Sequence, residues 1–107
     1  MVRETVAAML EDEGFEVVEA SDAEAALALV RDGLDAPLIV TDVDLGAGPS
    51  GVDLADMLRR MRPDMRIIFI TGRLSSLADR GADDREAILP KPFASEALSR
   101  LVKRMTT

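Results

Sequence analysis

Three reactive side chains in this sequence each follow a short apolar run. Asp42 ends the run 37–42 (PLIVTD), Thr71 ends 65–71 (MRIIFIT), and Lys91 follows 86–89 (EAIL). If these runs are parallel strands of one open sheet, their carboxyl ends meet at the edge where such sheets carry their functional crevice. A carboxylate, a hydroxyl and an ammonium beside a hard cation suit formation of an acyl phosphate, in which the carboxylate attacks phosphorus and the positive charges neutralise the transferred group.

Each of the three residues also has a simpler interpretation. Asp42 could cap a loop, Thr71 could satisfy a strand end, and Lys91 could be a solvated turn residue, because these residue types are common at turns and surfaces. Spacing alone does not distinguish a phosphoacceptor site from an ordinary ion pair. The convergence of all three residues favours a site over three unrelated surface residues.

The composition excludes several classes of function. The chain has 107 residues of which 48% are apolar, enough for one domain with one modest core. Its 20 acidic and 13 basic residues give a net charge of −7, which disfavours direct binding to nucleic acid. The absence of His and Cys excludes disulfides, thiol chemistry and the common zinc sites. Oxygen chemistry remains, with Mg²⁺ or Ca²⁺ as the expected type of metal.

The sequence shows no targeting or membrane signal. Its longest apolar runs, such as 67–70, are far too short to span a bilayer, and residues 1–4 lack the pattern of a secretory signal. We therefore expect a soluble, cytoplasmic chain with no membrane partner.

Hydrophobic periodicity predicts an alternation of helices and strands. Helices are expected over 2–13, from a capping box at 21–24 to about 33, over 52–61, weakly within 73–85, and over 94–105. Strands are expected at 15–20, 37–42, 65–71 and 86–89. This order predicts an α/β fold of the flavodoxin-like class: a doubly wound parallel sheet with helices on both faces. A βα repeat ought to begin with a strand, whereas this chain begins inside a helix.

Four segments, in this order, resemble the receiver domain of bacterial two-component response regulators over essentially the whole chain except its beginning. They are 38–45 (LIVTDVDL), which resembles the phosphoacceptor strand and its exit, 50–54 (SGVDL), 68–72 (IFITG) and 89–93 (LPKPF). Each segment alone is a weak signal, and the four together are a strong one.

The resemblance implies a role for each site residue. Asp42 would accept a phosphoryl group from a sensor histidine kinase or phosphotransfer protein, and Asp42 and the backbone carbonyl of Asp44 would hold Mg²⁺. Thr71 would move toward the phosphoryl group, and Lys91 would pair with it ahead of a cis bond to Pro92, the residue type at which a cis bond is least costly. Asp44 and Arg73 match positions that tune the lifetime of the phosphate.

The chain departs from the family pattern in three places. The first strand of the family, which lies in the middle of the five-stranded sheet and ends in two acidic residues of the Mg²⁺ site, has no counterpart before Val2. Ile88 stands where many receivers have a Tyr or Phe whose rotation is coupled to the Thr71 position. The loop 45–50 (LGAGPS) is rich in glycine and lacks the usual proline.

The absent strand has energetic consequences. Each backbone group that it leaves buried and unpaired costs about 1 to 3 kcal/mol. We therefore expect the chain to re-pair its strands, to borrow a strand from another copy, or to fold poorly. Mg²⁺ binding is expected to be weak, because Asp42 and one carbonyl leave most of an octahedral shell to water.

The resulting prediction is one receiver domain over 1–107 with no output domain, a regulatory domain rather than an enzyme. It would signal by contact with an output partner that the sequence does not name, with a homodimer or strand exchange as a further expectation. The alternative is a pseudo-receiver, an interaction module that keeps the fold and neither binds Mg²⁺ nor is phosphorylated. An unrelated enzyme on the same fold has little support, because the chain has no His, no Cys and no nucleotide-binding glycine motif.

Overall fold

The computed structural model describes residues 3–20, 22–43, 50–71 and 85–106. Four helices and three strands lie in these ranges: α1 (Arg3–Asp12), α2 (Ala23–Arg31), β1 (Leu38–Asp42), α3 (Gly51–Met61), β2 (Arg66–Thr71), β3 (Glu86–Pro90) and α4 (Ser95–Thr106). The short helix predicted within 73–85 falls almost wholly outside the described residues.

The three strands form one parallel sheet in the order β1-β2-β3. The register pairs Asp42 of β1 with Ile70 of β2, and Thr71 of β2 with Pro90 of β3. All three strands therefore end at the same edge of the sheet, as the sequence predicts.

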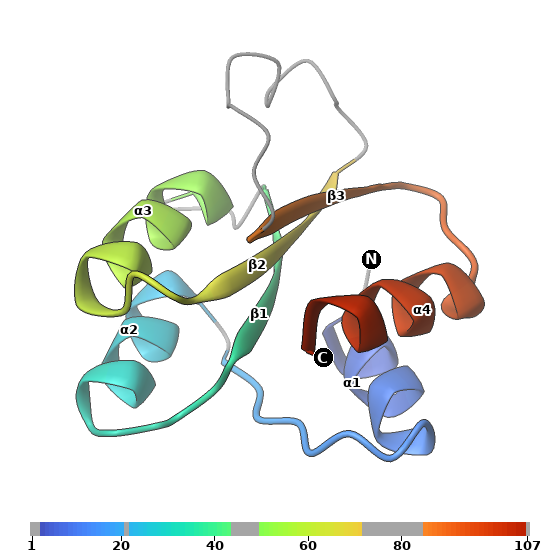
Figure 1. Cartoon of the computed structure of the whole chain (residues 1–107), viewed down its shortest axis with the longest axis horizontal. Helices are drawn as coiled ribbons and strands as arrows, with labels where there is room; N and C mark the ends of the chain where they lie inside the picture. The colour runs from blue at the N-terminus through green and yellow to red at the C-terminus, as the bar shows by residue number, and fades with distance from the viewer. Residues whose placement is uncertain (1–2, 21, 44–49, 72–84, 107) are drawn as a thin grey trace.

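Helices cover both faces of this sheet, with α2 and α3 on one face and α1 and α4 on the other (Figure 1). Strand β2 supplies both cores by alternation: Ile67 and Phe69 pack against α2 and α3, and Ile68 and Ile70 pack against α1 and α4. All four side chains are fully buried, which explains why the run is apolar without alternating with polar residues. The doubly wound architecture predicted from the sequence is confirmed.

Helix α3, which follows β1, begins with a capping box. The Ser50 hydroxyl accepts a hydrogen bond from the Asp53 backbone N–H at 3.1 Å, and the Asp53 carboxylate accepts one from the Ser50 N–H at 3.2 Å. These bonds satisfy backbone donors that a helix start leaves without partners. Helix α3 is thus started immediately beside the end of β1.

The cap of α2 differs from the prediction by one residue. Asp22 rather than Ser21 is the N-cap, and its carboxylate accepts a hydrogen bond from the Ala25 N–H at 2.8 Å. Asp and Ser are comparable caps, so the pattern at 21–24 identifies the helix start and not the capping residue.

The prediction of a strand at 15–20 is wrong. These residues form no helix or strand, and β1 pairs with β2 alone in the described sheet. The β-forming residues Val17 and Val18 have no adjacent strand with which to form a ladder, and β-propensity reflects such neighbours more than the backbone itself. Of the three outcomes expected from the sequence, re-pairing of the strands does not occur in the described part of the chain.

Within the described ranges, no helix combines the length and the apolar character needed to cross a lipid bilayer.

Candidate functional site

Asp42 and Lys91 are brought into direct contact at the carboxyl edge of the sheet. Lys91 Nζ lies 2.7 Å from Asp42 Oδ2, although the two residues are far apart in sequence. The side chains are 17% exposed for Asp42 and 29% for Lys91. The pair is therefore mostly buried, and part of each side chain reaches solvent.

Backbone hydrogen bonds hold the two residues of this ion pair in place. The Val43 N–H donates to the Ile70 carbonyl at 3.1 Å, and the Lys91 N–H donates to the Thr71 carbonyl at 2.9 Å. Both bonds extend the strand ladders by one residue, beyond Asp42 at the end of β1 and beyond Pro90 at the end of β3. They therefore fix the backbone beside Asp42 and at Lys91. The peptide bond between Lys91 and Pro92 is cis, which confirms the expectation from the resemblance.

Thr71 ends the central strand, between the ends of β1 and β3. It is 1% exposed, and its carbonyl is the acceptor for the backbone of Lys91. The structure thus places the carboxylate, the hydroxyl and the ammonium on the ends of three consecutive strands, with a direct side-chain contact between the carboxylate and the ammonium.

Gly51 is a site residue that sequence reasoning missed. A Cβ built at this position would overlap the Asp42 carbonyl oxygen and lie 3.0 Å from Val43 Cα, and the Gly51 N–H donates to the Val43 carbonyl at 2.8 Å. The first residue of α3 therefore packs directly on the backbone of the Asp42 strand end. The signal available in the sequence was the glycine immediately after the Ser50 cap.

Replacing Gly51 by alanine is expected to displace the end of β1. The clash is with backbone rather than with a flexible side chain, so the free energy of unfolding should fall by about 1 to 3 kcal/mol, as for other overpacked sites. Denaturant unfolding measures this loss.

Gly33→Ala is the matched control. The φ of Gly33, +107°, makes alanine strained there, but no atom crowds the added Cβ as the Asp42 backbone does at Gly51. Any phosphorylation of the folded protein should decline in Gly51→Ala and not in Gly33→Ala; equal phosphorylation would contradict the positioning role.

The remaining predicted positions have mixed outcomes. Asp44 and Arg73 lie outside the described residues, so their roles stay predictions. Ile88 is 44% exposed on β3, which leaves an aliphatic side chain at the surface where many relatives of the resembled family have an aromatic one.

Mg²⁺ is the metal that the sequence predicts for this site. The described residues contain no group of three acidic side chains that could hold a metal, and Asp42 is the carboxylate among them that the resemblance assigns to Mg²⁺. Mg²⁺ commonly binds through one or two carboxylates, keeps several waters and takes further oxygens from phosphate. The partly exposed Asp42 carboxylate would supply one of these carboxylate ligands, and the remaining oxygens would come from elsewhere.

The parallel sheet order, with helices on both faces, defines an α/β fold of the flavodoxin-like class. The profile of the response regulator receiver domain matches residues 1–103, and the chain belongs to that family. A crystal structure of a response regulator receiver protein from Sinorhizobium medicae has a TM-score of 0.87 to this chain at 30% identity, covering 96% of this chain and 83% of the other. The receiver domain of NtrX from Brucella abortus has a TM-score of 0.81 at 29% identity, covering 97% and 90%.

Curated relatives are longer proteins. The transcriptional regulatory protein CpxR of Escherichia coli is 38% identical over 95 residues, which are 84% of this chain and 38% of the relative. The sensor kinase CckA of Brucella abortus is 32% identical over 99 residues, which are 90% of this chain and 10% of the relative. This chain thus spans well under half the length of these relatives, in which a receiver occurs within a regulator or a kinase.

Proposed function

We propose that this chain is a phosphoacceptor receiver that takes a phosphoryl group onto Asp42 and signals through protein contacts. The observation that carries the proposal is the 2.7 Å contact between Lys91 Nζ and Asp42 Oδ2 at the carboxyl edge of the sheet. This contact orients the carboxylate and puts a positive charge where a phosphoryl group on Asp42 would carry its negative charge.

The proposed step is a transfer from a phosphorylated histidine of a partner protein. One Asp42 oxygen forms a bond to phosphorus while the bond from phosphorus to the imidazole nitrogen breaks. The electron pair of the broken bond stays on that nitrogen, which takes a proton from water. The Lys91 ammonium then pairs with a phosphoryl oxygen, and the Thr71 hydroxyl donates a hydrogen bond to another.

Mg²⁺ bound by Asp42 and the Asp44 carbonyl would neutralise charge on the transferred group. Because the described residues hold no group of three acidic side chains that could bind it, we expect weak binding before phosphorylation. Catalysis of the transfer would therefore depend on Lys91 to a greater degree than in a site with more carboxylates.

The proposed partners are a sensor histidine kinase or phosphotransfer protein as donor, and an output protein as receiver of the signal. Two relatives with these receiver segments are named as a sensor kinase and a transcriptional regulator. For this chain we propose one receiver domain over 1–107 with a regulatory role and a cytoplasmic location.

The test is incubation of the purified chain with a small acyl-phosphate donor, with and without Mg²⁺, followed by intact mass measurement. We expect one phosphoryl group per chain, formed faster with Mg²⁺ and lost again on hydrolysis. Circular dichroism on the same sample shows whether the protein is folded. A folded chain that takes up no phosphoryl group would favour the pseudo-receiver alternative, an interaction module without phosphorylation.

A further inference from the structure

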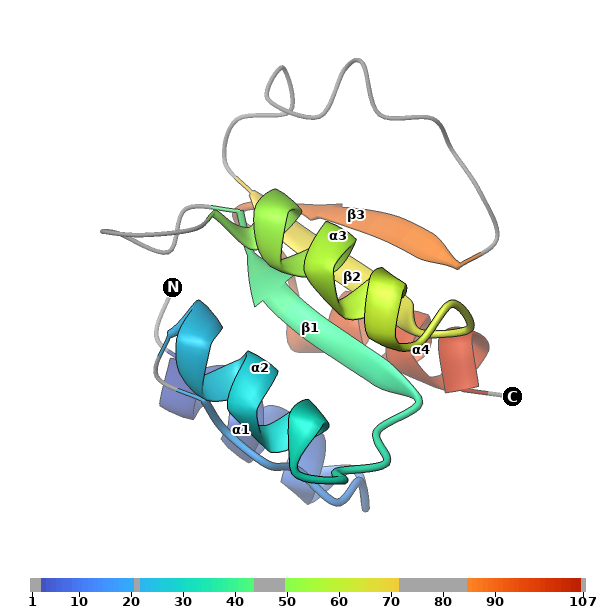
Figure 2. The same cartoon turned by 90° about the vertical axis from the view of Figure 1, so that its left-hand side faces the viewer.

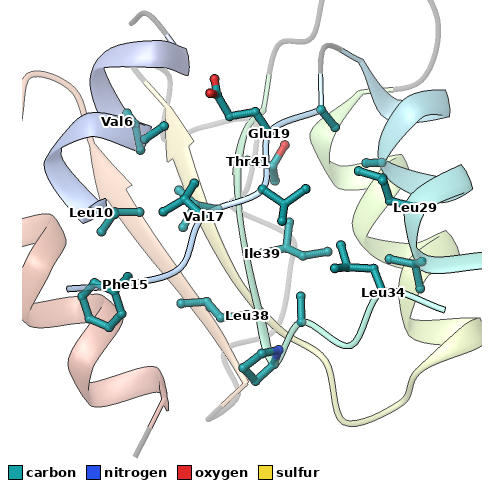
Figure 3. Close-up of a pocket in the computed structure, with 18 of the residues that line it drawn as sticks. Val6, Leu10, Phe15, Val17, Glu19, Leu29, Leu34, Leu38, Ile39 and Thr41 are labelled. Carbon is teal, nitrogen blue, oxygen red and sulfur yellow. The ribbon is translucent and has the colours of Figure 1, made fainter. Parts of the chain in front are cut away.

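The residue before Asp42 carries a hydroxyl on an otherwise apolar face of β1. Side chains alternate along a strand, so Thr41 shares a face with Ile39 and Val43, which both pack in the core beneath α2 and α3. Thr41 is itself 7% exposed. Figure 3 shows Ile39 and Thr41 in turn along β1, with the Thr41 hydroxyl directed toward the end of the strand. Valine has nearly the same shape and would suit this apolar face, so packing alone does not account for the hydroxyl.

The Thr41 hydroxyl bonds to the backbone of Asp42. Thr41 Oγ1 donates a hydrogen bond to the Asp42 carbonyl at 3.0 Å. The ladder with β2 does not hold this carbonyl. The Val43 N–H donates to the Ile70 carbonyl, so Val43 faces β2, and the backbone groups of the preceding Asp42 point away from β2. Thr41 therefore supplies a hydrogen bond to the Asp42 carbonyl that the neighbouring strand cannot supply.

The peptide unit that joins Asp42 to Val43 is thus held at both ends. Its N–H donates to the Ile70 carbonyl at 3.1 Å, and its carbonyl accepts from Thr41 at 3.0 Å. A peptide unit is planar, so two bonds directed to opposite sides of β1 fix the orientation of the whole plane. Gly51 lies against the same carbonyl at the start of α3, which stands beside the end of β1 in Figure 2. Thr41 and Gly51 together therefore confine this carbonyl.

The orientation of this plane determines where the Asp42 side chain begins. Asp42 Cα is one of the six atoms of the plane, and the side chain extends from it to the 2.7 Å contact between Oδ2 and Lys91 Nζ. Phosphoryl transfer demands close alignment of the reacting atoms, and a misplacement of about 1 Å can lower a rate about 100-fold. A tilt of the peptide plane would therefore change both the alignment of the carboxylate and the rate of transfer to it.

We propose that Thr41 is a positioning residue for phosphoryl transfer to Asp42. Its hydroxyl holds the carbonyl of the peptide between Asp42 and Val43, and this keeps the Asp42 carboxylate aligned with Lys91. Thr41 acts through the backbone of Asp42 and not on the phosphoryl group. The inference rests on the proposed function, because it assigns to Thr41 a part in the transfer to Asp42.

Three substitutions of Thr41 separate the hydroxyl from the shape of the side chain. Thr41→Val keeps the shape and removes the hydroxyl, Thr41→Ala removes the hydroxyl in a smaller side chain, and Thr41→Ser keeps the hydroxyl. With an acyl phosphate over a range of concentrations, we expect the maximum rate of phosphoryl uptake to fall about 3- to 10-fold in Thr41→Val and Thr41→Ala. The acyl-phosphate concentration that gives half the maximum rate should stay unchanged. Thr41→Ser should keep the maximum rate within about twofold.

Thr106→Val is the matched control for loss of a threonine hydroxyl. Thr106 Oγ1 also donates to a backbone carbonyl, that of Val102 at 2.8 Å, but it lies in the last turn of α4, whose first turn follows Lys91. Thr106→Val should therefore take up phosphoryl groups at the rate of the unsubstituted chain.

Amide hydrogen exchange at Val43 gives a readout that does not depend on phosphorylation. The Val43 N–H belongs to the peptide plane that Thr41 holds, so its exchange should become about 3- to 10-fold faster in Thr41→Val. Thr41→Ser and Thr106→Val should leave this exchange rate unchanged. Circular dichroism shows whether each variant is folded.

The outcomes distinguish this inference from the proposed function. If the unsubstituted chain takes up a phosphoryl group, an unchanged rate of uptake or an unchanged exchange rate at Val43 in folded Thr41→Val overturns the positioning role alone. Equal losses of rate in Thr41→Val and Thr41→Ser would assign the effect to packing and overturn the positioning role as well. No uptake by the unsubstituted chain overturns the proposed function, and the positioning role with it.

Discussion

Asp42→Asn should take up no phosphoryl group from an acyl-phosphate donor, while the unsubstituted chain takes up one. Asparagine keeps the size of the side chain, and its amide oxygen can still accept a hydrogen bond from Lys91, which contacts Oδ2 in this structure. The amide lacks the negative charge and the nucleophilic oxygen that form an acyl phosphate. The loss should therefore be complete, with little change in the fold.

Asp64→Asn is the matched control, because Asp64 is an exposed carboxylate in the turn before β2. Intact mass after equal incubation should show full uptake in this control and none in Asp42→Asn. An Asp42→Asn protein that is folded and still gains a phosphoryl group would remove Asp42 from the role of acceptor.

Lys91→Ala has the second largest expected effect. The Lys91 ammonium lies 2.7 Å from the Asp42 carboxylate, and its side chain is 29% exposed. In the proposed transfer it would stabilise the developing charge at a site that is partly open to water. Loss of one such group in a water-excluded site costs about 100- to 1,000-fold in rate. Because solvent screens part of the charge here, we expect the rate of phosphoryl uptake to fall about 10- to 100-fold.

The control for this variant is Lys103→Ala, which removes an exposed lysine of α4 that pairs with Glu13 at 3.3 Å. Lys103→Ala should phosphorylate at the rate of the unsubstituted chain. Both variants should lose less than about 1 kcal/mol of stability, since partly exposed ion pairs contribute little. Equal rates in Lys91→Ala and Lys103→Ala would show that the contact with Asp42 is structural only.

The positions of Asp42, Thr71 and Lys91 could be predicted because the physics that places them is local and strong. Apolar runs such as Ile67–Ile70 do not alternate with polar residues, which identifies them as strands buried on both faces. Once the strands are parallel, their last residues must share one edge. The sequence order of the three site residues then determines that they meet.

The segment at 15–20 shows where this reasoning fails. Its composition favours a strand, yet a strand exists only through pairing, and the neighbour needed beside β1 is not among the described elements. Gly51 was missed for a similar reason: its close approach to the Asp42 carbonyl depends on how α3 packs on the end of β1, and no local pattern encodes that contact. Local periodicity predicts elements, whereas tertiary contacts decide which of them form and how closely they pack.

The central claim is that Asp42 carries the phosphoryl group, and mapping that group to a residue tests it most directly. Borohydride reduction of the phosphorylated chain converts an aspartyl phosphate to homoserine, which peptide mass spectrometry locates. We predict a single reduced residue, at Asp42, that depends on prior incubation with the donor. Reduction at another carboxylate, or a phosphoryl group found on Ser50 or Thr71 with Asp42 unmodified, would contradict the account.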